Sequence, residues 1–491
     1  MESKTFKLKS SRLEFFDQSL ALYEGCEFGL AKTEPGNRLA ILGNQSEIQK
    51  FGFKGTFSEL NHNCLLFCDL HHDNALALRN TLPWLQPITF GLRTSAGMGD
   101  RLGLATPEHV RAIQKTGGVI APIFAQQSIR EMSRTLRTPD KVLDDATWGV
   151  FQENWQRGVG ADADHLKTTE DIDLCLSSGF TFFTIDPGNF VNNTTEYVQP
   201  GELYKIVQTY PSQIQVSKTG LLNKSFKLEG IKIDFSESVL LKAVVKYGLA
   251  IWHVKSMFEH LKTNAKSPFE LEVSVDETDL PTSHAEHFYI ASELKRLGVK
   301  WVSLAPRYIG RFEKGVDYIG DLAKFEVDLK GHAQIAQYLG PYKLSLHSGS
   351  DKYSIYPIMN AYTNGLVHLK TTGTSYLEAL HTIADLDEDL IKEIYIFARD
   401  RYEIDRKSYH VSSQLSKAPL PDDVSNWAEL IQQFDAREIF HVTFGSVLTE
   451  KMENGTFLFY ERFMNFLKKN AEKYTENLEK HFVRHLQPFE K

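Results

Sequence analysis

The sequence predicts an α/β protein organised around a (β/α)8 barrel. Between about residues 86 and 385, eight short apolar runs recur, and helical patterns separate most of them. Several of these runs end on a carboxylate, an imidazole or an amine. Alternating strands and helices are typical of a parallel sheet, and such folds gather functional side chains at the carboxyl ends of their strands. We therefore expect a catalytic barrel with its site at that end.

Two other regions flank the predicted barrel. Residues 1–85 contain short strand-like runs broken by Gly, Asn and Pro, which indicates a separate α+β region. Residues 386–491 show mainly helical patterns, for example at Leu390–Arg399, and predict a helical extension packed on the barrel. Residues 189–236 interrupt the alternation with polar sequence ending in a β-hairpin pattern, and we expect an insertion that could serve as a lid.

Each barrel strand is predicted from an apolar run and its flanking signals. We assign Ile88–Leu92 to the first strand, because a Gly-rich loop and a helix start at Thr106 follow it. The third strand ends at His165, and the next helix has Thr168 as its N-cap with Asp171 three residues later. The other strands are expected at 118–124, 180–186, 269–277, 300–305, 342–346 and 366–371.

The composition argues against several classes of function. The 491 residues carry a formal net charge of −8 at pH 7, and no basic stripe indicates nucleic-acid binding. The N-terminus lacks an apolar signal-like segment, and no apolar run approaches the ~18 residues of a membrane span. Four cysteines give no disulfide framework. We expect a cytoplasmic protein without membrane or nucleic-acid partners, and its oligomeric state stays open, a homo-oligomer included.

Polar side chains are predicted at the rim of the barrel, where the carboxyl ends of all strands meet. They combine imidazoles with carboxylates, which suits a divalent metal such as Zn, Mn, Ni, Co or Fe. The competing interpretation is that some of them are hydrogen-bonded structural residues. The predicted rim residues are Asp164, His165, Asp186, Glu277, Arg307, His347 and Lys370.

Further candidates for substrate binding lie on loops and strand ends. Asp100 and Arg101 follow the first predicted strand and are expected to contact substrate, with a surface ion pair as the alternative. Gln127 closes the second strand and either contacts a ligand or caps the next helix. Ser348 and Lys352 follow the seventh strand, and the lysine is a candidate partner for a substrate carboxylate.

Two motif regions resemble class II metal-dependent ketose-bisphosphate aldolases. They are Ala161–His165 with the following Gly179–Gly188, and Leu344–Ser350. Most of the chain also resembles a closer family, the tagaturonate epimerases, which interconvert tagaturonate and fructuronate and use a divalent metal. The motifs that carry this second resemblance are Gly97–Pro107, Asp164-His165, Leu346–Lys352 and Lys370–Tyr376.

The aldolase resemblance implies roles for individual residues. Asp164 corresponds to the proton-transfer residue, and His165 and His347 correspond to metal ligands. The aldolases take a third histidine from the sixth strand, and this sequence has none there. Asp317, in the loop after that strand, is the first choice for the third ligand, and Glu277 is the second.

The epimerase resemblance implies an isomerase that acts on a small sugar acid. The two sugars differ at a carbon β to the ketone, whose C–H that carbonyl does not acidify, so inversion calls for retro-aldol cleavage and re-addition. Asp164 and Glu277 are expected as the acid/base pair, Lys352 or Lys370 as the cation for the carboxylate, and a divalent metal as the stabiliser of the enediolate. The Gly-rich loop lacks the Gly-x-Gly-x-x-Gly order, which argues against transient oxidation by a nicotinamide cofactor. A class II aldolase and a non-catalytic sugar-binding barrel remain alternatives.

Overall fold

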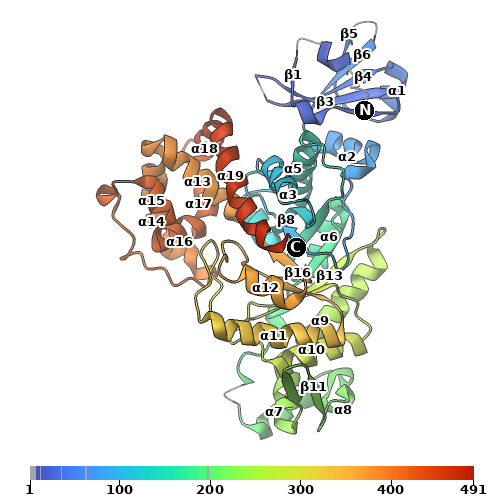
Figure 1. Ribbon diagram of the computed structural model, residues 1–491, viewed down its shortest axis with the longest axis vertical. Coiled ribbons are helices and arrows are strands. Elements are labelled where there is room, and N and C mark those ends of the chain that lie inside the picture. Colours follow the sequence, from blue (N-terminus) through green and yellow to red (C-terminus); the bar gives the residue numbers. More distant parts are fainter. Residues whose placement is uncertain (1–6, 11–12, 35, 61–62, 196–197, 491) are drawn as a thin grey trace.

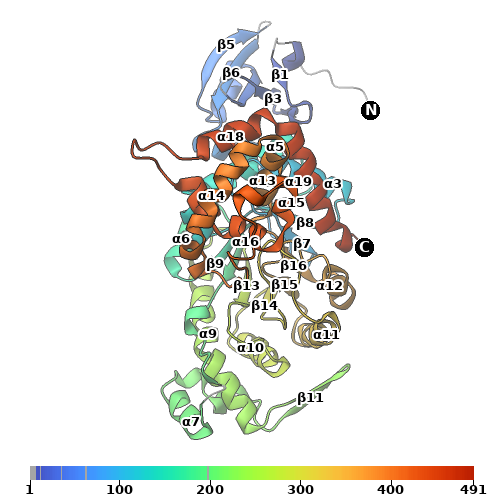
Figure 2. The same cartoon turned by 90° about the vertical axis from the view of Figure 1, so that its left-hand side faces the viewer.

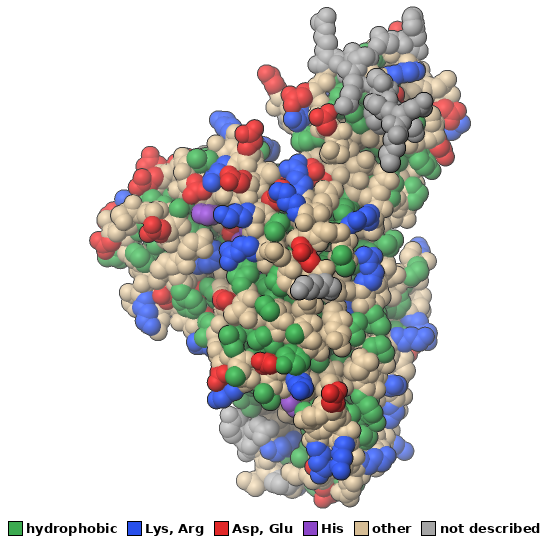
Figure 3. All heavy atoms as spheres, in the orientation of Figure 1, with side chains coloured by type: hydrophobic (Ala, Val, Ile, Leu, Met, Phe, Trp, Pro, Cys, Tyr) green, Lys and Arg blue, Asp and Glu red, His purple; other side chains and the backbone are tan. Residues whose placement is uncertain are grey.

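The protein is elongated, with the barrel at its centre (Figure 1). The computed structural model describes residues 7–10, 13–34, 36–60, 63–195 and 198–490. An antiparallel sheet from the N-terminal residues lies at one end, and the segment containing α7, α8 and β11 lies at the other (Figure 1). The C-terminal helices cover one side of the barrel (Figure 2). On the face drawn in Figure 3, acidic and basic side chains are scattered and do not form a single stripe.

The N-terminal sheet is antiparallel, with the strand order β1-β3-β4-β6-β5 and β2 paired to β3. Its apolar side chains, including Phe28, Leu39 and Ile41, are buried in the hydrophobic core. Helix α2 (His72–Thr81) leads into the barrel, where Arg79 forms a 2.9 Å ion pair with Asp144. The strands are β1 (Glu14–Phe15), β2 (Ala21–Tyr23), β3 (Cys26–Lys32), β4 (Arg38–Gly43), β5 (Thr56–Leu60) and β6 (Asn63–Asp69), with α1 (Gln45–Lys50) between β4 and β5.

Eight parallel strands close the central barrel in the order β10-β13-β14-β15-β16-β7-β8-β9, which confirms the predicted fold class. Because all eight run in one direction, their carboxyl ends share one mouth. The strands are β7 (Ser95–Gly97), β8 (Ala121–Ser128), β9 (Gly160–Leu166), β10 (Phe182–Ile185), β13 (Glu270–Val275), β14 (Ser303–Pro306), β15 (Lys343–Leu346) and β16 (Val367–Lys370).

The first barrel strand differs from the prediction. Ser95–Gly97, expected within the Gly-rich loop, pairs with β16 and β8, whereas Ile88–Leu92 forms no strand. The hydrophobicity of Ile88–Leu92 has another cause, because Phe90 packs against Ala121, Ile123 and Phe182 of the barrel. A short strand of small residues carries little apolar signal of its own, so periodicity selected the neighbouring run.

Helices surround the barrel and begin at recognisable caps. The predicted capping box of α6 (Thr169–Ser178) is present: the Asp171 N–H donates to Thr168 Oγ1 at 3.2 Å, and the Thr168 N–H donates to Asp171 Oδ2 at 3.1 Å. The helix ends at Gly179, whose φ of 98° is left-handed, as glycine permits. The other surrounding helices are α3 (Thr106–Lys115), α4 (Ile129–Arg134), α5 (Pro139–Gln152), α9 (Glu237–Asn264), α10 (His284–Arg296), α11 (Leu322–Leu339), α12 (Tyr356–Thr363) and α13 (Thr374–Leu386).

The segment between β10 and α9 contains the expected hairpin, formed by β11 (Ser225–Leu228) and β12 (Ile231–Asp234). It also contains the helices α7 (Pro200–Gln208) and α8 (Val216–Thr219). It lies at the end of the molecule opposite the N-terminal sheet (Figures 1 and 2). Among its described residues, none lines the hollows at the barrel mouth considered below, so its position does not match that of a lid.

The C-terminal part is helical and packs on the barrel helices, with α19 against α3 and α13. Between α14 and α15, a non-helical segment carries Tyr409, His410 and Val411 to the barrel mouth. In the described part of the chain, no helix is both long and apolar enough to span a membrane. The helices are α14 (Glu388–Asp405), α15 (Trp427–Gln432), α16 (Phe434–Val442), α17 (Phe444–Thr449), α18 (Tyr460–Lys469) and α19 (Ala471–Leu486).

Candidate active site

Charged side chains from four strands meet at the carboxyl end of the barrel. Asp164 comes from β9, Glu272 from β13, His347 from the residue after β15, and Lys370 from the end of β16. All four are buried. Their convergence follows from the closed parallel barrel, which turns alternate side chains of every strand toward the interior.

His165 has an unusual backbone that directs its ring into the mouth. Its φ is 52°, within the left-handed region that a non-glycine residue rarely adopts. Asp164 Oδ1 lies 2.7 Å from His165 Nδ1, which fixes the ring orientation. His165 Nε2 lies on the opposite side of the ring, 3.7 Å from Asp276 Oδ1.

His347 is also held by a carboxylate, but through its Nε2 rather than its Nδ1. Glu272 Oε1 lies 2.6 Å from His347 Nε2, and Asp276 Oδ1 lies 3.3 Å from His347 Nδ1. The centroids of the His165 and His347 rings are 4.9 Å apart. One nitrogen of each imidazole is therefore fixed by a carboxylate, and the other faces Asp276.

Lys370 connects the carboxylates beneath the two imidazoles. Its Nζ lies 2.9 Å from Asp162 Oδ2, 2.6 Å from Asp164 Oδ1 and 3.0 Å from Glu272 Oε1. Burial alone would lower the pKa of Lys370, but these three carboxylates raise it well above its usual value. Because its ammonium is saturated by protein groups, Lys370 is not free to bind a substrate carboxylate as the sequence suggested.

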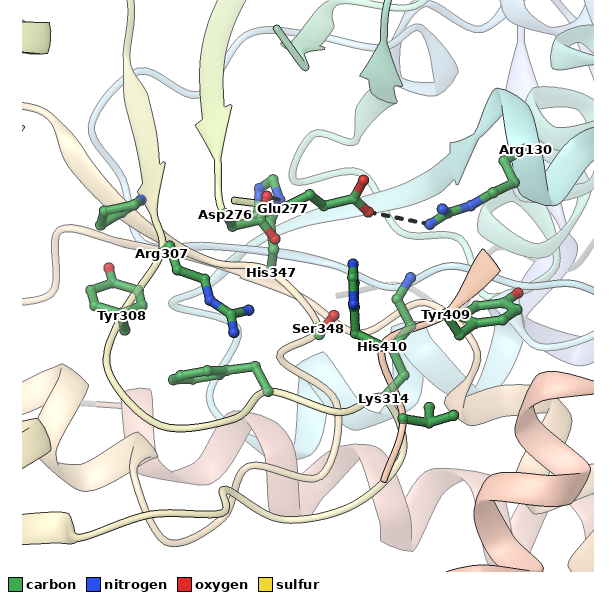
Figure 4. A pocket seen from close by; sticks show the side chains of 13 residues that line it. Arg130, Asp276, Glu277, Arg307, Tyr308, Lys314, His347, Ser348, Tyr409 and His410 are labelled. Carbon is green, nitrogen blue, oxygen red and sulfur yellow. Dashed lines mark hydrogen bonds and ion pairs between the residues drawn. The ribbon is translucent and has the colours of Figure 1, made fainter. Parts of the chain in front are cut away.

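Outside this inner cluster lies a hollow that opens to solvent (Figure 4). Glu277 faces it with a partly exposed side chain and lies 3.4 Å from Arg130 Nη2. A second, smaller hollow lies deeper, beside His165, and is called the inner hollow. Lys314 lines both hollows. The other residues of the outer hollow are Asp276, Pro306, Arg307, Tyr308, Phe312, His347, Ser348, Tyr409, His410 and Val411.

The structure brings together some of the predicted site residues. Asp164, His165, Glu277, His347 and Lys370 line the inner hollow together with Ser348. Arg307 joins them at the outer hollow. The sequence placed these residues at strand ends or in the turns directly after them, and that placement predicted their convergence.

Asp317 lies apart from the cluster, although the sequence made it the first choice for the third metal ligand. Its carboxylate is exposed and accepts hydrogen bonds from the N–H and Oγ of Ser354, at 3.2 and 2.9 Å. It lines a separate hollow with Asp351 and Arg437. The loop after β14 lines the mouth at Lys314 but lines the separate hollow from Gly315 to Asp317, and sequence alone could not give that path.

Lys352 also has a different environment from the predicted one. It is buried, and its Nζ donates to the carbonyl oxygens of Glu313 (2.6 Å), Ser350 (2.9 Å) and Val316. With three backbone acceptors satisfied, it ties the loop after β14 to the loop after β15. Its position indicates a structural role for the side chain that sequence analysis placed on the substrate.

Asp100 and Arg101 hold the loop after β7. The Asp100 carboxylate accepts the N–H groups of Leu102 (2.8 Å) and Ala105 (2.6 Å). The buried Arg101 guanidinium lies 2.7 Å from Glu131 Oε1 and 3.6 Å above the Phe444 ring centroid. Neither residue lines the hollows at the mouth.

Gln127 and Asp186 are engaged in local contacts as well. Gln127 Oε1 accepts a hydrogen bond from Arg137 Nη1 at 3.1 Å. Asp186 lies 3.2 Å from Lys167 Nζ and accepts the N–H of Gly188 at 2.8 Å. Neither is among the residues lining the hollows, so the structure does not bring these predicted contacts to the mouth.

Several site residues escaped sequence analysis. Asp276 directly precedes Glu277 and could have been found as a second acid at the same strand end. Glu272 points inward from the middle of β13, and its alternation along the strand was the only available signal. Lys314 and His410 come from irregular loops, and no pattern of spacing marks such residues.

The donor set at the mouth fits a divalent cation. Three groups of His and acidic residues in the described parts of the chain could hold a metal ion, and only Asp164, His165 and His347 lie at the mouth. Asp276, which is outside that group, has its Oδ1 3.7 Å from His165 Nε2 and 3.3 Å from His347 Nδ1, while Asp164 and Glu272 lie against the other nitrogen of each ring. A carboxylate on the far nitrogen of each ligating imidazole is the usual arrangement around protein-bound metals.

Fold and site together define a (β/α)8-barrel enzyme with an acid, imidazole and lysine cluster at the carboxyl ends of its strands. The chain belongs to the tagaturonate epimerase family, whose model matches residues 16–489. It is accordingly an isomerase of the carbohydrate epimerase type.

Named relatives cover nearly the whole chain. It is 42% identical over 489 residues to a tagaturonate/fructuronate epimerase of Thermotoga maritima, covering 99% of each protein. It is also similar to the native crystal structure of fructuronate-tagaturonate epimerase UxaE from Cohnella laeviribosi, with a TM-score of 0.91, 36% identity and 98% of both chains covered. A glycerol-complexed structure of that protein gives a TM-score of 0.92 and 35% identity over the same shares.

Proposed function

We propose that the protein interconverts D-tagaturonate and D-fructuronate by retro-aldol cleavage and re-addition. The observation that carries the proposal is the convergence of His165, His347 and Asp276 beside the partly exposed Glu277. Membership of the tagaturonate epimerase family supports the choice of substrates. This reaction requires a bound cation that stabilises the enediolate and a carboxylate that exchanges protons with solvent, and the site has residues suited to both roles.

The position of the inverted carbon determines the reaction type. Because that carbon is β to the ketone, its C–H is not acidic, whereas its hydroxyl makes the molecule a β-hydroxy ketone. Loss of the hydroxyl proton lets the C–C bond break, so that the oxygen becomes an aldehyde and the bonding electrons pass to the ketone fragment as an enediolate. Each fragment has three carbons. Rotation of the aldehyde, re-addition of the enediolate and protonation of the new alkoxide complete the inversion.

His165, His347 and Asp276 are the residues proposed to hold the divalent cation, with Asp164 and Glu272 orienting the imidazoles. When bound, the cation would supply positive charge that stabilises oxygen anions of the ketone fragment. Asp276 replaces Asp317 in this assignment because its carboxylate, and not that of Asp317, lies between the two imidazoles.

Glu277 and Asp164 are proposed to move the protons on opposite sides of the cluster. Glu277 is suited to take the hydroxyl proton, because it faces the hollow and is paired with Arg130 at 3.4 Å, and because, although burial would raise its pKa, the nearby His165 helps to hold that pKa below the usual value. Asp164 lines the hollow on the other side and would pass to the new alkoxide a proton taken from solvent there. Each turnover then takes up one proton through Asp164 and releases one from Glu277, so both carboxylates end in their starting state while Lys370 keeps its proton and holds Asp164 in place at 2.6 Å.

Incubation of the metal-loaded protein with tagaturonate, followed by chromatography, tests the proposal. Fructuronate should form, and metal removal by a chelator should abolish its formation until a divalent cation is restored. Substrate deuterated at the inverted carbon should keep its label, because that C–H bond is never broken. Loss of the label to water would exclude the retro-aldol route, and accumulation of free three-carbon fragments would favour an aldolase.

A further inference from the structure

The substrate carboxylate needs a cationic partner, and the two lysines expected from the sequence are already occupied. Lys370 is paired with three carboxylates, and Lys352 donates to three carbonyl oxygens. Arg130 is paired with Glu277. Among the described residues, the lysine and arginine left at the mouth are Lys314 and Arg307, and both reach into the outer hollow (Figure 4).

Lys314 has no partner of its own within the part of the chain that the structure describes: its Nζ forms neither a hydrogen bond nor an ion pair there. Burial lowers the pKa of this ammonium against the opposing effect of Glu131, so the nearby carboxylates do not fully compensate its burial. A partly buried ammonium without a direct ion pair or hydrogen bond is costly unless a ligand supplies the contacting anion. The side chain therefore calls for an anion from outside the protein.

The backbone around Lys314 is fixed, although its side chain is free. On one side, the Glu313 carboxylate accepts hydrogen bonds from the N–H and Oγ of Ser412, at 2.8 and 3.0 Å. On the other side, the Gly315 N–H donates to Ser350 Oγ at 3.2 Å, and its carbonyl oxygen accepts from Arg437 Nε. Three different parts of the chain, namely the loop with Ser350 and Lys352, Ser412, and Arg437, thus hold one short loop that presents a single unpaired lysine. Such preorganisation favours ligand binding, because the loop need not be ordered when a ligand arrives.

Lys314 is also better placed than Arg307 to serve the whole reaction. It lines the inner hollow with Asp164, His165 and Glu277 as well as the outer one, whereas Arg307 lines only the outer hollow. Cleavage leaves the carboxylate on the aldehyde fragment, which must rotate without escaping. An ammonium on a flexible stem can follow that rotation more easily than a planar guanidinium with fixed bidentate geometry.

We propose that Lys314 binds the carboxylate of the substrate and retains the carboxylate-bearing aldehyde fragment while it rotates. Lys314 then determines the preference for uronates over neutral ketoses. This inference rests on the proposed function, since it names the group that recognises the acid end of that substrate.

The test compares Lys314→Met, Lys314→Arg and Arg307→Met in the metal-loaded protein. For each, kcat/KM is measured with tagaturonate and with the matching ketose that has a hydroxymethyl group in place of the carboxylate. Loss of a charge-assisted hydrogen bond should lower the uronate value in Lys314→Met roughly 10- to 100-fold. The rate with the neutral ketose should change less than about threefold, and Lys314→Arg should restore part of the uronate activity.

Binding of glycerate, a three-carbon carboxylate that resembles the aldehyde fragment, gives a second readout. Its inhibition constant should rise in Lys314→Met by the same factor as the uronate kcat/KM falls. Lys392→Met is the matched control, because this exposed lysine is paired with Asp422 in the C-terminal region, and it should leave both values unchanged.

The outcomes separate the inference from the proposed function. A wild-type protein that does not convert tagaturonate with any divalent cation refutes the function itself. An active wild type whose Lys314→Met variant keeps its uronate preference and its glycerate affinity overturns the role of Lys314. Loss of that preference in Arg307→Met alone would likewise overturn it and transfer the role to Arg307.

Discussion

Glu272 Oε1 lies 2.6 Å from Nε2 of His347, and this contact determines which nitrogen of the ring is available at the mouth. With Nε2 engaged, Nδ1 faces Asp276. Asp164 acts in the same way on the Nδ1 of His165, 2.7 Å away. Each imidazole is thus oriented by a buried acid from a barrel strand.

Replacement of Glu272 by Gln should weaken divalent cation binding about 10- to 100-fold, the usual effect of losing an orienting carboxylate. The amide can still accept a hydrogen bond, but it removes the negative charge that raises the basicity of the ring. Titration of the metal-free protein with Mn²⁺, followed by calorimetry, measures the change. Glu270→Gln is the matched control, because Glu270 is a buried acid on the same strand that accepts a hydrogen bond from the Gly91 N–H. An equal affinity in both variants would argue against an orienting role.

Asp276→Asn and Asp317→Asn should differ in metal content. The first substitution removes a carboxylate that both imidazoles face, so bound metal and activity should be lost together. The second alters an exposed residue that bonds to Ser354, so both should persist. Elemental analysis of the purified variants measures their metal content. Retention of stoichiometric metal by Asp276→Asn would require another third ligand.

Glu277→Gln should retain the cation while turnover falls by roughly 10²-fold or more, the scale expected for loss of an acid/base group. Asp164→Asn should also lose turnover, with a weaker affinity for the cation because Asp164 orients His165 as well. Measuring kcat at saturating metal separates the two effects. If Asp164→Asn regains full kcat under saturation, Asp164 only orients His165 and transfers no proton.

The contribution of Glu438 to stability should decline as the pH rises from about 5 to 8. Burial raises the pKa of this carboxyl to about 8, helped by Glu313, and neither of its oxygens has a hydrogen-bond partner among the described residues. The folded protein therefore binds a proton that the unfolded chain releases near its ordinary pKa, and folding loses on the order of 1 kcal/mol per pH unit in between.

Thermal unfolding of Glu438→Gln over the same pH range tests this account. The glutamine keeps the neutral form at every pH, so this part of the slope should disappear. Glu393→Gln is the control: the hydrogen bond and charge of Arg462 hold the pKa of Glu393 below its usual value, so it stays ionised from pH 5 to 8. That variant should retain the wild-type slope. A Glu438→Gln protein with an unchanged slope would contradict the assignment.

Residues at or directly after strand ends were predictable, because barrel closure brings strand ends together whatever the loops do. Asp164, His165, Glu277 and His347 reached one mouth for this reason. The apolar run at Ile88–Leu92 misled the assignment of the first strand, since Phe90 supplies a hydrophobic residue that packs against barrel side chains without belonging to a strand.

Loop residues were not predictable to the same degree. Asp317 and Lys314 are three positions apart, yet one is exposed beside Ser354 and the other faces the hollow. Their difference depends on hydrogen bonds from Lys352 and Arg437, which are distant in sequence. Periodicity describes neighbours along a helix or strand, so it contains no information on such long-range contacts.

The segment Tyr409–Val411 determines whether the barrel can be separated from the C-terminal part and keep its site. It belongs to the C-terminal part and yet forms part of the wall of the outer hollow. Near the end of the chain, His485 Nε2 accepts the Asp351 N–H at 2.9 Å and so supports the loop that follows His347. A barrel excised at residue 386 would contain every proposed metal ligand but would lack both supports. The catalytic chamber is therefore not a transplantable module, and a refolding chain should regain turnover only after its last helix has docked.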